Sequence, residues 1–437
     1  MLRKLVKLII PVGVFRVVEP TGHLMEAIFW NLVLGFPARG LKVIGVTGTD
    51  GKTTTSTMIY TMLNDAGIKT GLMTTIGYGV PGDWHDNHVH MTTMQTKPML
   101  ERIRQLRRAG IECLVLETTS HALAQHRVWG IPYSVAVVTN ITHEHLDYHG
   151  TYERYREAKL LLFRQVAVGS GLKIGIINAD DSSAPYCMAT GVKPMTYGVV
   201  AASADLRARE VRSGATGSTY KLKFGDQIAT VQVHLPGSFN VSNSLAAAAV
   251  GQALGLSAPQ IVHGIGALKT VEGRMNQIDV GQDFAVIVDF AHTPDSFDKI
   301  FASMRDLTQG RLIVMFGSAG RRDVSKRGKQ GAIAGKWADV VVITEEDDRD
   351  VDGQEIMDQI AGGAESAGKV RNTNLFLVPD RTDAINFAVN KARFGQGDTV
   401  LLLGKGHEKT IERADGEHPW DELSTARQAV KQRLMAK

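Results

Sequence analysis

One short loop constrains the fold of this chain more than any other feature: residues 43–55 read VIGVTGTDGKTTT. The apolar run at 41–46 is typical of a buried strand, and the threonines after Lys52 are typical of the first turn of a helix. In such a unit, backbone N–H groups surround phosphate oxygens, a lysine adds positive charge and a hydroxyl such as that of Thr53 can bind Mg²⁺. The loop proper, G-T-D-G-K-T at 48–53, can also be an ordinary turn, but its flanks predict a nucleoside-triphosphate site.

The composition is that of a globular protein with two or three domains, because 437 residues exceed the usual size of one domain. A net charge of +4 is too small to indicate a nucleic-acid partner and suits anionic small-molecule substrates. The two cysteines, Cys113 and Cys187, stand in apolar surroundings without metal-ligand spacing. They predict reduced core residues in a cytoplasmic protein.

Residues 1–40 are unusually apolar for the start of such a chain. Residues 2–16 mix aliphatic and basic side chains, and Pro11 and Gly13 are expected to break any helix there. The run 24–36 predicts either a helix packed on the body of the protein or a peripheral segment on the inner face of the cell membrane. No apolar run is long enough to span a bilayer, and no signal-peptide cleavage site follows the basic stretch.

Strands and helices are predicted to alternate after the apolar start, which favours a parallel sheet with its site at the carboxyl ends of the strands. The predicted strands are 41–46, 69–76, 111–116, 133–138 and 172–177, and the predicted helices are 56–66, 97–108, 152–165 and 237–254. Residues 81–90 are expected to form a loop. Residues 202–233 contain short alternating runs between turn glycines, which predicts antiparallel strands.

A second α/β pattern follows in the C-terminal part. Its predicted strands are 284–289, 312–316, 340–344, 375–378 and 399–403. The sequence therefore predicts an α/β protein in three parts: a short apolar segment at 1–40, a central P-loop domain with a parallel sheet at 41–273, and a Rossmann-like domain at 274–437.

Polar residues gather where the predicted strands of the central domain end. Glu117 ends one strand, and His143, His145 and His149 follow the next. Together with Thr53 they could complete a Mg²⁺ site, since this ion takes few protein ligands. Taken singly, the glutamate can instead serve a helix N-terminus and each histidine can be structural. Zinc is disfavoured because cysteine ligands are lacking and the histidine spacing is not that of a helical pair.

Several longer motifs of this sequence match those of a known protein family. In order, they are GVTGTDGKTTT, ETTSHALAQHR, TNITHEHLDYHGTYERYREAKLLLF, GSFNVSN, VEGRM, VDFAHTPDSF, VMFGSAGRRD and LLLGKGHE. Together they resemble the Mur ligases of peptidoglycan synthesis, most closely the MurE branch, which adds the third residue of the stem peptide. The resemblance extends from Leu41 to the C-terminus, and motifs of this length are jointly specific.

The resemblance implies an amide-forming reaction that uses ATP and Mg²⁺. In the family, ATP phosphorylates a substrate carboxylate, and the amine of an amino acid attacks the acyl phosphate to give an amide, ADP and phosphate. The positions that match ATP-binding residues are Gly48, Thr49, Asp50, Gly51, Lys52, Thr53, Thr54, Asn240, Asn243, Arg274 and Asp289. Those that match catalytic residues are Lys52, Lys159, Arg274 and His292.

The resemblance also implies a metal site and a motion. The positions that match Mg²⁺ ligands are Thr53, Glu117, His145 and Lys159, with Lys159 expected as a carbamate. Without the motif, Lys159 would be interpreted as a solvated lysine on a helix. A nucleotide shared between two domains implies closure on binding, which excludes water and orients the amine.

Two further sets of positions match substrate contacts. Those for the muramyl-dipeptide acceptor are Thr92, Thr93, Thr119, Ser120, Gln125 and Arg127, of which the arginine is the natural partner of a carboxylate. Those for the added amino acid are Arg322, Glu346, Asp347, Arg349, Gly404 and Glu408.

This chain departs from the family at the specificity motif. Diaminopimelate-adding enzymes have Asp-Asn-Pro-Arg, whereas residues 346–349 read Glu-Asp-Asp-Arg. The arginine suits the distal carboxylate of meso-diaminopimelate, while Asp347 and Asp348 add negative charge that favours an ammonium group. Meso-diaminopimelate is the expected amine, with lysine or another amine as the alternatives.

A second departure is the short segment ahead of the phosphate loop, where the family has a whole UDP-binding domain. The expected acceptor is UDP-MurNAc-L-Ala-D-Glu or a close relative. The alternatives are a lipid-linked muropeptide or a polyglutamate- or cyanophycin-type acceptor. Outside the ligases, the chain could be a non-catalytic nucleotide-binding protein or a P-loop phosphohydrolase. The resemblance implies a monomer, while the apolar N-terminal segment could equally form a dimer interface.

Overall fold

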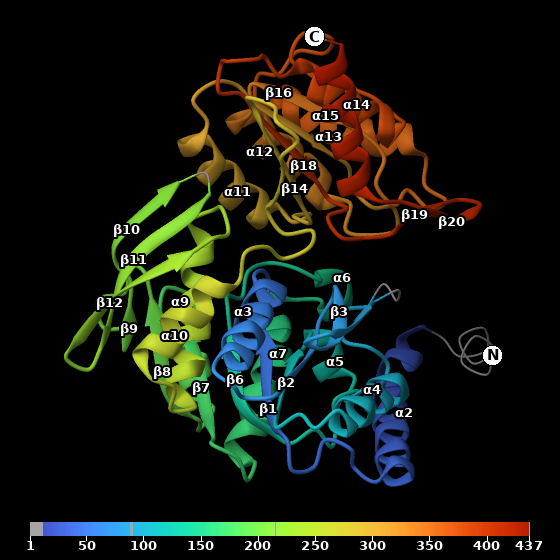
Figure 1. Ribbon diagram of the computed structural model, residues 1–437. Helices are drawn as coiled ribbons and strands as arrows, with labels where there is room; N and C mark the ends of the chain where they lie inside the picture. Colours follow the sequence, from blue (N-terminus) through green and yellow to red (C-terminus); the bar gives the residue numbers. More distant parts are fainter. Residues whose placement is uncertain (1–11, 88–90, 215, 437) are drawn as a thin grey trace.

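The computed structural model describes residues 12–87, 91–214 and 216–436, which form two α/β units. The first unit, coloured blue to yellow in Figure 1, lies below the second, coloured orange to red. Both units are built from parallel strands joined by helices, so the predicted fold class is confirmed.

A nine-stranded sheet forms the centre of the first unit, in the order β4-β3-β2-β5-β1-β6-β7-β8-β9. Its strands are β1 (Lys42–Thr47), β2 (Thr70–Met73), β3 (Gly77–Val80), β4 (Asp83–Asp86), β5 (Cys113–Glu117), β6 (Tyr133–Val138), β7 (Ile174–Asn178), β8 (Lys193–Gly198) and β9 (Leu206–Arg207). All pairs from β2 to β9 are parallel, while β3 and β4 add an antiparallel edge. Because β1 lies between β5 and β6, the residues that follow these three strands meet at one edge of the sheet.

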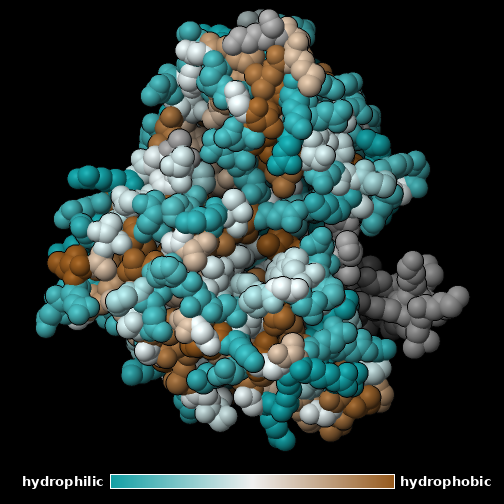
Figure 2. Space-filling model, in the orientation of Figure 1, coloured by the Kyte–Doolittle hydropathy of each residue, from teal (hydrophilic) through white to brown (hydrophobic). Residues whose placement is uncertain are grey.

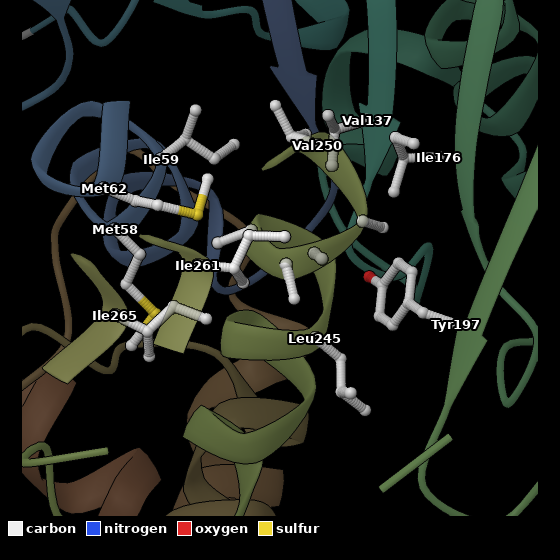
Figure 3. Packing of buried hydrophobic residues seen from close by; sticks show 14 of the residues in the cluster. Met58, Ile59, Met62, Val137, Ile176, Tyr197, Leu245, Val250, Ile261 and Ile265 are labelled. Carbon is white, nitrogen blue, oxygen red and sulfur yellow. The ribbon is translucent and has the colours of Figure 1, made fainter. Parts of the chain in front are cut away.

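Helices cover both faces of this sheet, which explains why its central strands β5 and β6 are buried along their whole length and β1 at every residue after Lys42. The helices are α2 (Val12–Leu34), α3 (Lys52–Asp65), α4 (Thr96–Arg108), α5 (Ser120–Ala124), α6 (Leu146–His149), α7 (Tyr152–Val168), α8 (Ala184–Met188), α9 (Phe239–Ala253) and α10 (Ala258–Ala267). α3, α9 and α10 pack on one face, where Met58, Leu245 and Ile261 belong to one core (Figure 3). α4, α5 and α7 form a second core on the other face. Cys113 and Cys187 are buried and free in these cores, as predicted.

A small antiparallel sheet stands beside the first unit. Its strands are β10 (Arg209–Gly214), β11 (Gly217–Phe224) and β12 (Gln227–Val233). The antiparallel strands predicted within 202–233 are thus confirmed for these three. β9 differs, because it pairs in parallel with β8 and extends the main sheet.

The second unit contains a six-stranded sheet in the order β13-β14-β18-β15-β16-β17. Its strands are β13 (Asn276–Ile278), β14 (Ala285–Asp289), β15 (Leu312–Phe316), β16 (Val340–Ile343), β17 (Leu375–Leu377) and β18 (Thr399–Leu403); a separate hairpin is formed by β19 (Thr410–Arg413) and β20 (Gly416–Pro419). The helices are α11 (Pro294–Leu307), α12 (Ser325–Trp337), α13 (Gly353–Ser366), α14 (Arg381–Lys391) and α15 (Glu422–Met435). All five strands predicted from sequence are confirmed, whereas β13 and the hairpin were not predicted.

Two predictions about the edge of the first sheet are wrong. The strand expected at 69–76 ends at Met73, because a turn begins at Thr74. The Thr74 N–H donates to the Gly77 carbonyl across this turn, at 2.8 Å. The loop expected at 81–90 contains β4, which pairs with β3. Every residue of β4 is exposed, so the strand shows no apolar alternation in the sequence. Residues 88–90 lie outside the described residues.

The predicted helix at 24–36 is part of the longer α2, which packs beside α4. Asn31, fully buried, donates from Nδ2 to the Trp129 carbonyl at 3.0 Å and ties this helix to the body of the unit. The expected break at Gly13 is wrong, since glycine costs only about 1 kcal/mol inside a helix; Pro11 lies outside the described residues. None of the described helices combines the length and apolar character needed to span a bilayer.

Candidate active site

The phosphate loop is shaped by two glycines that have no room for a side chain. Gly48 follows β1 with φ of +149°, and a Cβ there would collide with the Thr139 hydroxyl. Gly51 precedes α3 in the left-handed region, with φ of +81°, and a Cβ there would collide with the Asn243 carboxamide. The close approach of these two side chains therefore requires glycine at both loop positions.

The loop is held from β6 and leads into the N-terminus of α3. Asn140 accepts the Asp50 N–H at 3.0 Å and donates to the Asp50 carbonyl at 3.0 Å. Lys52 Nζ donates to the Thr49 carbonyl at 2.7 Å, across the loop. The first-turn N–H groups of α3, including that of Thr53, have no partners within the helix, and the helix dipole favours an anion there. The predicted loop residues thus form one anion-binding helix terminus.

Thr53 and Glu117 bring oxygen atoms together beside this loop. The Thr53 hydroxyl lies 3.0 and 3.2 Å from the two carboxylate oxygens of Glu117, which is 1% exposed. Thr75 donates to the same carboxylate through its N–H at 3.0 Å and its hydroxyl at 3.1 Å. A hydroxyl and a buried carboxylate are donors that Mg²⁺ takes alongside water and phosphate, so these residues fit the metal. Thr75 was missed because it lies inside the run predicted as a strand.

His145 contacts other residues than Glu117. Its ring packs edge-on against His121, with centroids 4.7 Å apart, and its Nε2 lies 3.5 Å from Glu144. Burial, and then His145, lower the pKa of His121 to about 3, so that ring is neutral. Within the described residues, no three His, Cys, Asp or Glu side chains converge on one point. An ion here would therefore depend on Thr53, Glu117 and substrate oxygens.

The remaining histidines of this region have structural contacts. His143 is exposed and stacks on Tyr152, with ring centroids 4.7 Å apart. His149 is buried, and its Nε2 lies 3.1 Å from the Ser120 hydroxyl. The structural interpretation of these two residues fits their surroundings.

Lys159 is buried at the phosphate loop. It is 2% exposed, its Nζ donates to the Gly48 carbonyl at 2.5 Å, and it lies 4.5 Å from the centroid of the Tyr155 ring. Burial, reinforced by the positive charge of Lys52, lowers the pKa of Lys159 well below its usual range. The interpretation as a solvated helix lysine is therefore wrong. A neutral amine is the form that adds CO₂, so the surroundings fit a carbamate.

The second unit brings two cationic side chains to the loop. Arg274 Nη2 donates to the Thr53 hydroxyl at 3.3 Å, and its guanidinium lies 4.5 Å from the centroid of the Phe290 ring. His292 Nε2 lies 3.7 Å from Glu144 of the first unit. Although burial acts in the opposite direction, Glu144 raises the pKa of His292, while His145 and then His292 lower the pKa of Glu144. The predicted residues Arg274 and His292 thus reach the site from the second unit.

Asp289 stabilises the backbone near the boundary between the two units. Its carboxylate accepts the N–H of Met275 at 2.7 Å and the N–H of Ala291 at 2.7 Å, and it is 6% exposed. Burial raises the pKa of Asp289, against the opposing effect of Arg274. In this geometry Asp289 fixes the backbone immediately after Arg274 and after Phe290, and a direct nucleotide contact would have to come from the rest of its motif.

Asn240 and Asn243 approach the loop from α9. Asn243 Nδ2 donates to Asn240 Oδ1 at 2.9 Å, and Asn240 Nδ2 donates to the Pro236 carbonyl at 2.7 Å. Asn243 Oδ1 also accepts the Thr55 hydroxyl at 3.3 Å. Asn243 thus lies against Gly51 and Thr55, and Asn240 lies behind it and holds its side chain.

The predicted acceptor residues form a threonine-rich cluster beside Glu117. Thr92 joins through Thr75, with hydroxyls 3.0 Å apart, and Thr93 and Thr119 are 3.2 Å apart. Gln125 follows α5 and is half-buried. Arg127 is 3% exposed and donates to the carbonyls of Thr93 and Met94. In this structure Arg127 therefore shapes the cluster, and a substrate carboxylate could reach it only after a rearrangement.

The predicted amino-acid residues gather where β16 and β18 end. Lys405 is fully buried and pairs with Asp347 at 2.8 Å and Glu408 at 2.5 Å. Arg349 is bound by Glu412, with Nε to Oε2 at 2.7 Å, so its guanidinium already has a carboxylate partner. Arg322 is exposed in the loop after β15. Lys405 and Glu412 were missed as parts of this site, although Lys405 lies inside the quoted motif LLLGKGHE.

Glu346 faces the open position at Gly404. It is 6% exposed, its Oε2 is buried without a hydrogen bond, and a Cβ on Gly404 would lie 2.8 Å from that oxygen. Burial first, and then the neighbouring carboxylates, raise the pKa of Asp348 to about 6. The end of β16 therefore offers negative charge and an unused acceptor, which suit an ammonium group.

A phosphate loop completed by an arginine from a second α/β unit is typical of a nucleotide-dependent enzyme. The model of the Mur ligase middle domain matches residues 46–251, and that of the Mur ligase, glutamate ligase domain matches residues 273–406. The chain belongs to the Mur ligase family, whose members are ATP-dependent amide ligases.

Two curated relatives place the chain near the MurE branch, as the motifs predicted. The UDP-N-acetylmuramyl-tripeptide synthetase of Roseiflexus sp. (strain RS-1) is 39% identical, over 96% of this chain and 84% of that protein. The UDP-N-acetylmuramoyl-L-alanyl-D-glutamate--2,6-diaminopimelate ligase of Geobacillus kaustophilus (strain HTA426) is also 39% identical, over 93% and 82%.

Solved structures agree with the fold. A UDP-N-acetylmuramoyl-L-alanyl-D-glutamate--2,6-diaminopimelate ligase superposes with a TM-score of 0.64 at 28% identity, covering 95% of this chain and 83% of that one. Mycobacterium tuberculosis folylpolyglutamate synthase, in complex with ADP, has a TM-score of 0.71 at 16% identity, over 96% and 95%. The latter likeness shows a common fold.

Proposed function

We propose that this chain is an ATP-dependent ligase that adds a diamino acid to the D-Glu carboxylate of UDP-MurNAc-L-Ala-D-Glu. The observation that carries the proposal is the meeting of Lys52, Thr53 and Glu117 with Arg274 from the second unit. This set can hold a triphosphate and Mg²⁺ together and neutralise the charge of a transferring phosphoryl group.

The reaction would proceed in two steps. The acceptor carboxylate oxygen attacks the γ-phosphorus of ATP, the bond to the β-phosphate oxygen breaks, and ADP leaves behind an acyl phosphate. The neutral amine of the incoming amino acid then attacks the acyl carbon, the C–O bond breaks, and phosphate and a proton are released with the new amide. Lys52 and Arg274 would stabilise the phosphoryl charge, and His292, held by Glu144, would lie beside the same phosphates.

Mg²⁺ would be held by Thr53 and Glu117 and would supply charge neutralisation between phosphate oxygens. Lys159, as a carbamate, would add an anion near this ion, while an ammonium there would repel it. His145 would join only after its ring left Glu144. Thr75 would orient the Glu117 carboxylate through its two hydrogen bonds.

Meso-diaminopimelate is the amine that we propose first, because Arg349 suits a distal carboxylate. Lysine is the second candidate, because Arg349 is already paired with Glu412 and the residues around Glu346 are acidic. The second unit would bind this amine, and the central domain at 41–273 would bind the ATP and the acceptor. All substrates would be small molecules, and the enzyme would act as a cytoplasmic monomer.

The test is phosphate release from ATP and Mg²⁺ with UDP-MurNAc-L-Ala-D-Glu, with each amine in turn and without amine. Release that requires both the acceptor and one amine is expected, and the amine that supports it is the added residue. Amine-independent release would indicate a phosphohydrolase, and nucleotide binding without turnover a non-catalytic protein. If only a lipid-linked muropeptide supports release, the acceptor assignment is wrong.

A further inference from the structure

The outer side of α2 is an apolar surface of the described chain. Met25, Phe29, Leu32 and Val33 are 64%, 56%, 65% and 55% exposed. Their spacing of one, three and four residues places them on one side of the helix, which we call the α2 face. Brown, hydrophobic atoms are visible at the lower right of the molecule, where the end of α2 lies (Figure 2).

The side of α2 opposite this face is already used. Ala27 and Asn31 are fully buried, and Trp30 and Leu34 pack against the core that contains α4. The helix is therefore fixed in place and cannot turn its exposed apolar side chains inward. Large apolar residues exposed together on a fixed helix indicate a surface that is covered in use.

Basic side chains contact the later half of α2 and the turn that follows it. Lys97 Nζ lies 4.6 Å from the centroid of the Trp30 ring, and the Arg39 guanidinium lies 5.6 Å from that of Phe36. Arg107 Nη1 donates to the carbonyl of Pro37, in the turn after α2, at 3.2 Å. Arg39, Lys97 and Arg107, which we call the basic border, are exposed, and so is Arg108, which follows Arg107 in the last turn of α4.

Three acidic side chains lie in the same area, and each has a partner. Glu19 and Glu26 lie 4.0 and 3.5 Å from His23, and Glu101 lies 4.0 Å from Lys97. The balance of exposed charge around the α2 face is therefore positive.

We propose that the α2 face and its basic border bind the surface of an anionic lipid bilayer, with α2 lying in the plane of the interface. An apolar stripe enters the boundary of the acyl chains, aromatic rings occupy the headgroup level, and the surrounding cations meet the lipid phosphates. A protein groove would cover the apolar side chains as well, but the cations that contact Trp30, Phe36 and Pro37 match the phosphates of an anionic bilayer. This attachment does not depend on the reaction proposed above.

The position of α2 leaves the active site accessible. α2 connects to the amino end of β1, whereas the phosphate loop follows the carboxyl end of that strand. Six strand residues separate the two ends by about 20 Å. A bilayer at the α2 face would therefore hold the enzyme without covering the phosphate loop.

The test is cosedimentation of the full chain with vesicles of phosphatidylcholine alone or mixed with phosphatidylglycerol, without ATP or substrates. Binding is expected to the anionic vesicles and to weaken in about 1 M salt. Phe29→Gln with Leu32→Gln is expected to lower the partition coefficient by about tenfold or more, because two apolar side chains leave the interface. Arg107→Gln with Arg108→Gln is expected to lower it by about fivefold for each charge.

Matched controls come from the other side of the first unit. Ile228→Gln removes an apolar side chain that is 69% exposed on β12, and Arg209→Gln with Arg212→Gln removes two exposed arginines of β10. These controls should bind vesicles like the unaltered chain, and all variants should retain its far-UV circular dichroism. Absence of binding to anionic vesicles, or equal loss in the controls, would overturn the proposal. So would a dimer that Leu32→Gln dissociates, because a second copy would then cover the face.

Discussion

The ion pair between Arg381 and Glu422 allows a quantitative prediction about the second unit. Both side chains are fully buried, and the guanidinium donates to the carboxylate at 2.7 and 2.9 Å. Arg381 also donates to the carbonyls of Glu345 at 2.9 Å and Leu403 at 2.7 Å, where β16 and β18 end. One arginine therefore connects α14 and α15 to the proposed amino-acid site.

Replacement of Arg381 by Met is expected to lower the free energy of unfolding by about 3–5 kcal/mol, because the Glu422 carboxylate would remain buried without its partner. Removal of both charges in Arg381→Met with Glu422→Gln should recover about 2 kcal/mol of that loss. Recovery is incomplete because two carbonyl groups still lack their donor. The exposed Arg371, which pairs with Glu365 and Asp358, is the matched control, and Arg371→Met should cost under about 1 kcal/mol.

Urea unfolding followed by circular dichroism measures these differences, and amide hydrogen exchange in β18 assigns them to the second unit. Phosphate-release kinetics should show a raised KM for the amine in Arg381→Met and an unchanged KM for ATP. A loss under about 1 kcal/mol, or a double variant no more stable than the single one, would refute the reasoning that an unpaired buried charge dominates.

Three further predictions concern Lys159, Thr75 and His121. Lys159→Gln should abolish ligase activity without unfolding the chain, and removal of CO₂ should reversibly inactivate the unaltered enzyme until bicarbonate is added; unchanged activity in CO₂-free buffer would count against the carbamate. Thr75→Val should raise the Mg²⁺ concentration for half-maximal rate by about tenfold, because Glu117 loses the hydrogen bond from the Thr75 hydroxyl and keeps only the one from the backbone N–H, whereas an unaltered Mg²⁺ dependence would exclude this orienting role. The folded pKa of His121, about 3, lies below its unfolded value of 6.5, so the unfolded state binds more protons between these values and stability should fall as pH decreases through that window. His121→Phe should make unfolding less dependent on pH there, and an equal slope in both proteins would contradict this.

Most of the architecture could be predicted from the sequence because the parallel strands are apolar throughout and punctuated by helices. β15 and β18 were placed at their observed bounds, since burial on both faces leaves an unmistakable apolar run. β4 could not be predicted, because an edge strand exposed along its length has no hydrophobic pattern. The hydrophobic pattern of a sequence reports burial. It therefore gives no signal for a strand that is held only by backbone hydrogen bonds.

For a related reason, some residues of the site could be predicted from the sequence and others could not. Glycines and Lys52 form a local motif, so the phosphate loop could be recognised from neighbouring residues. Lys159 and Arg127 instead owe their burial to segments far away in the sequence, and a single chain of letters gives no sign that a charged residue is buried. Thr75 was missed because it lies inside the run predicted as a strand, and because its bond to Glu117 joins residues 42 positions apart.

The placement of Arg274 has a consequence for wasteful hydrolysis of ATP. This arginine lies between Gly273, with φ of +67°, and Met275, with φ of +48° and an N–H bound by Asp289. It is thus part of the second unit and would move with it as a rigid attachment. Whenever the two units separate, the phosphate loop would lose a cation and the phosphoryl group would become less reactive. Phosphoryl transfer would therefore occur only after the substrates have docked the second unit, which binds the amine, onto the phosphate loop.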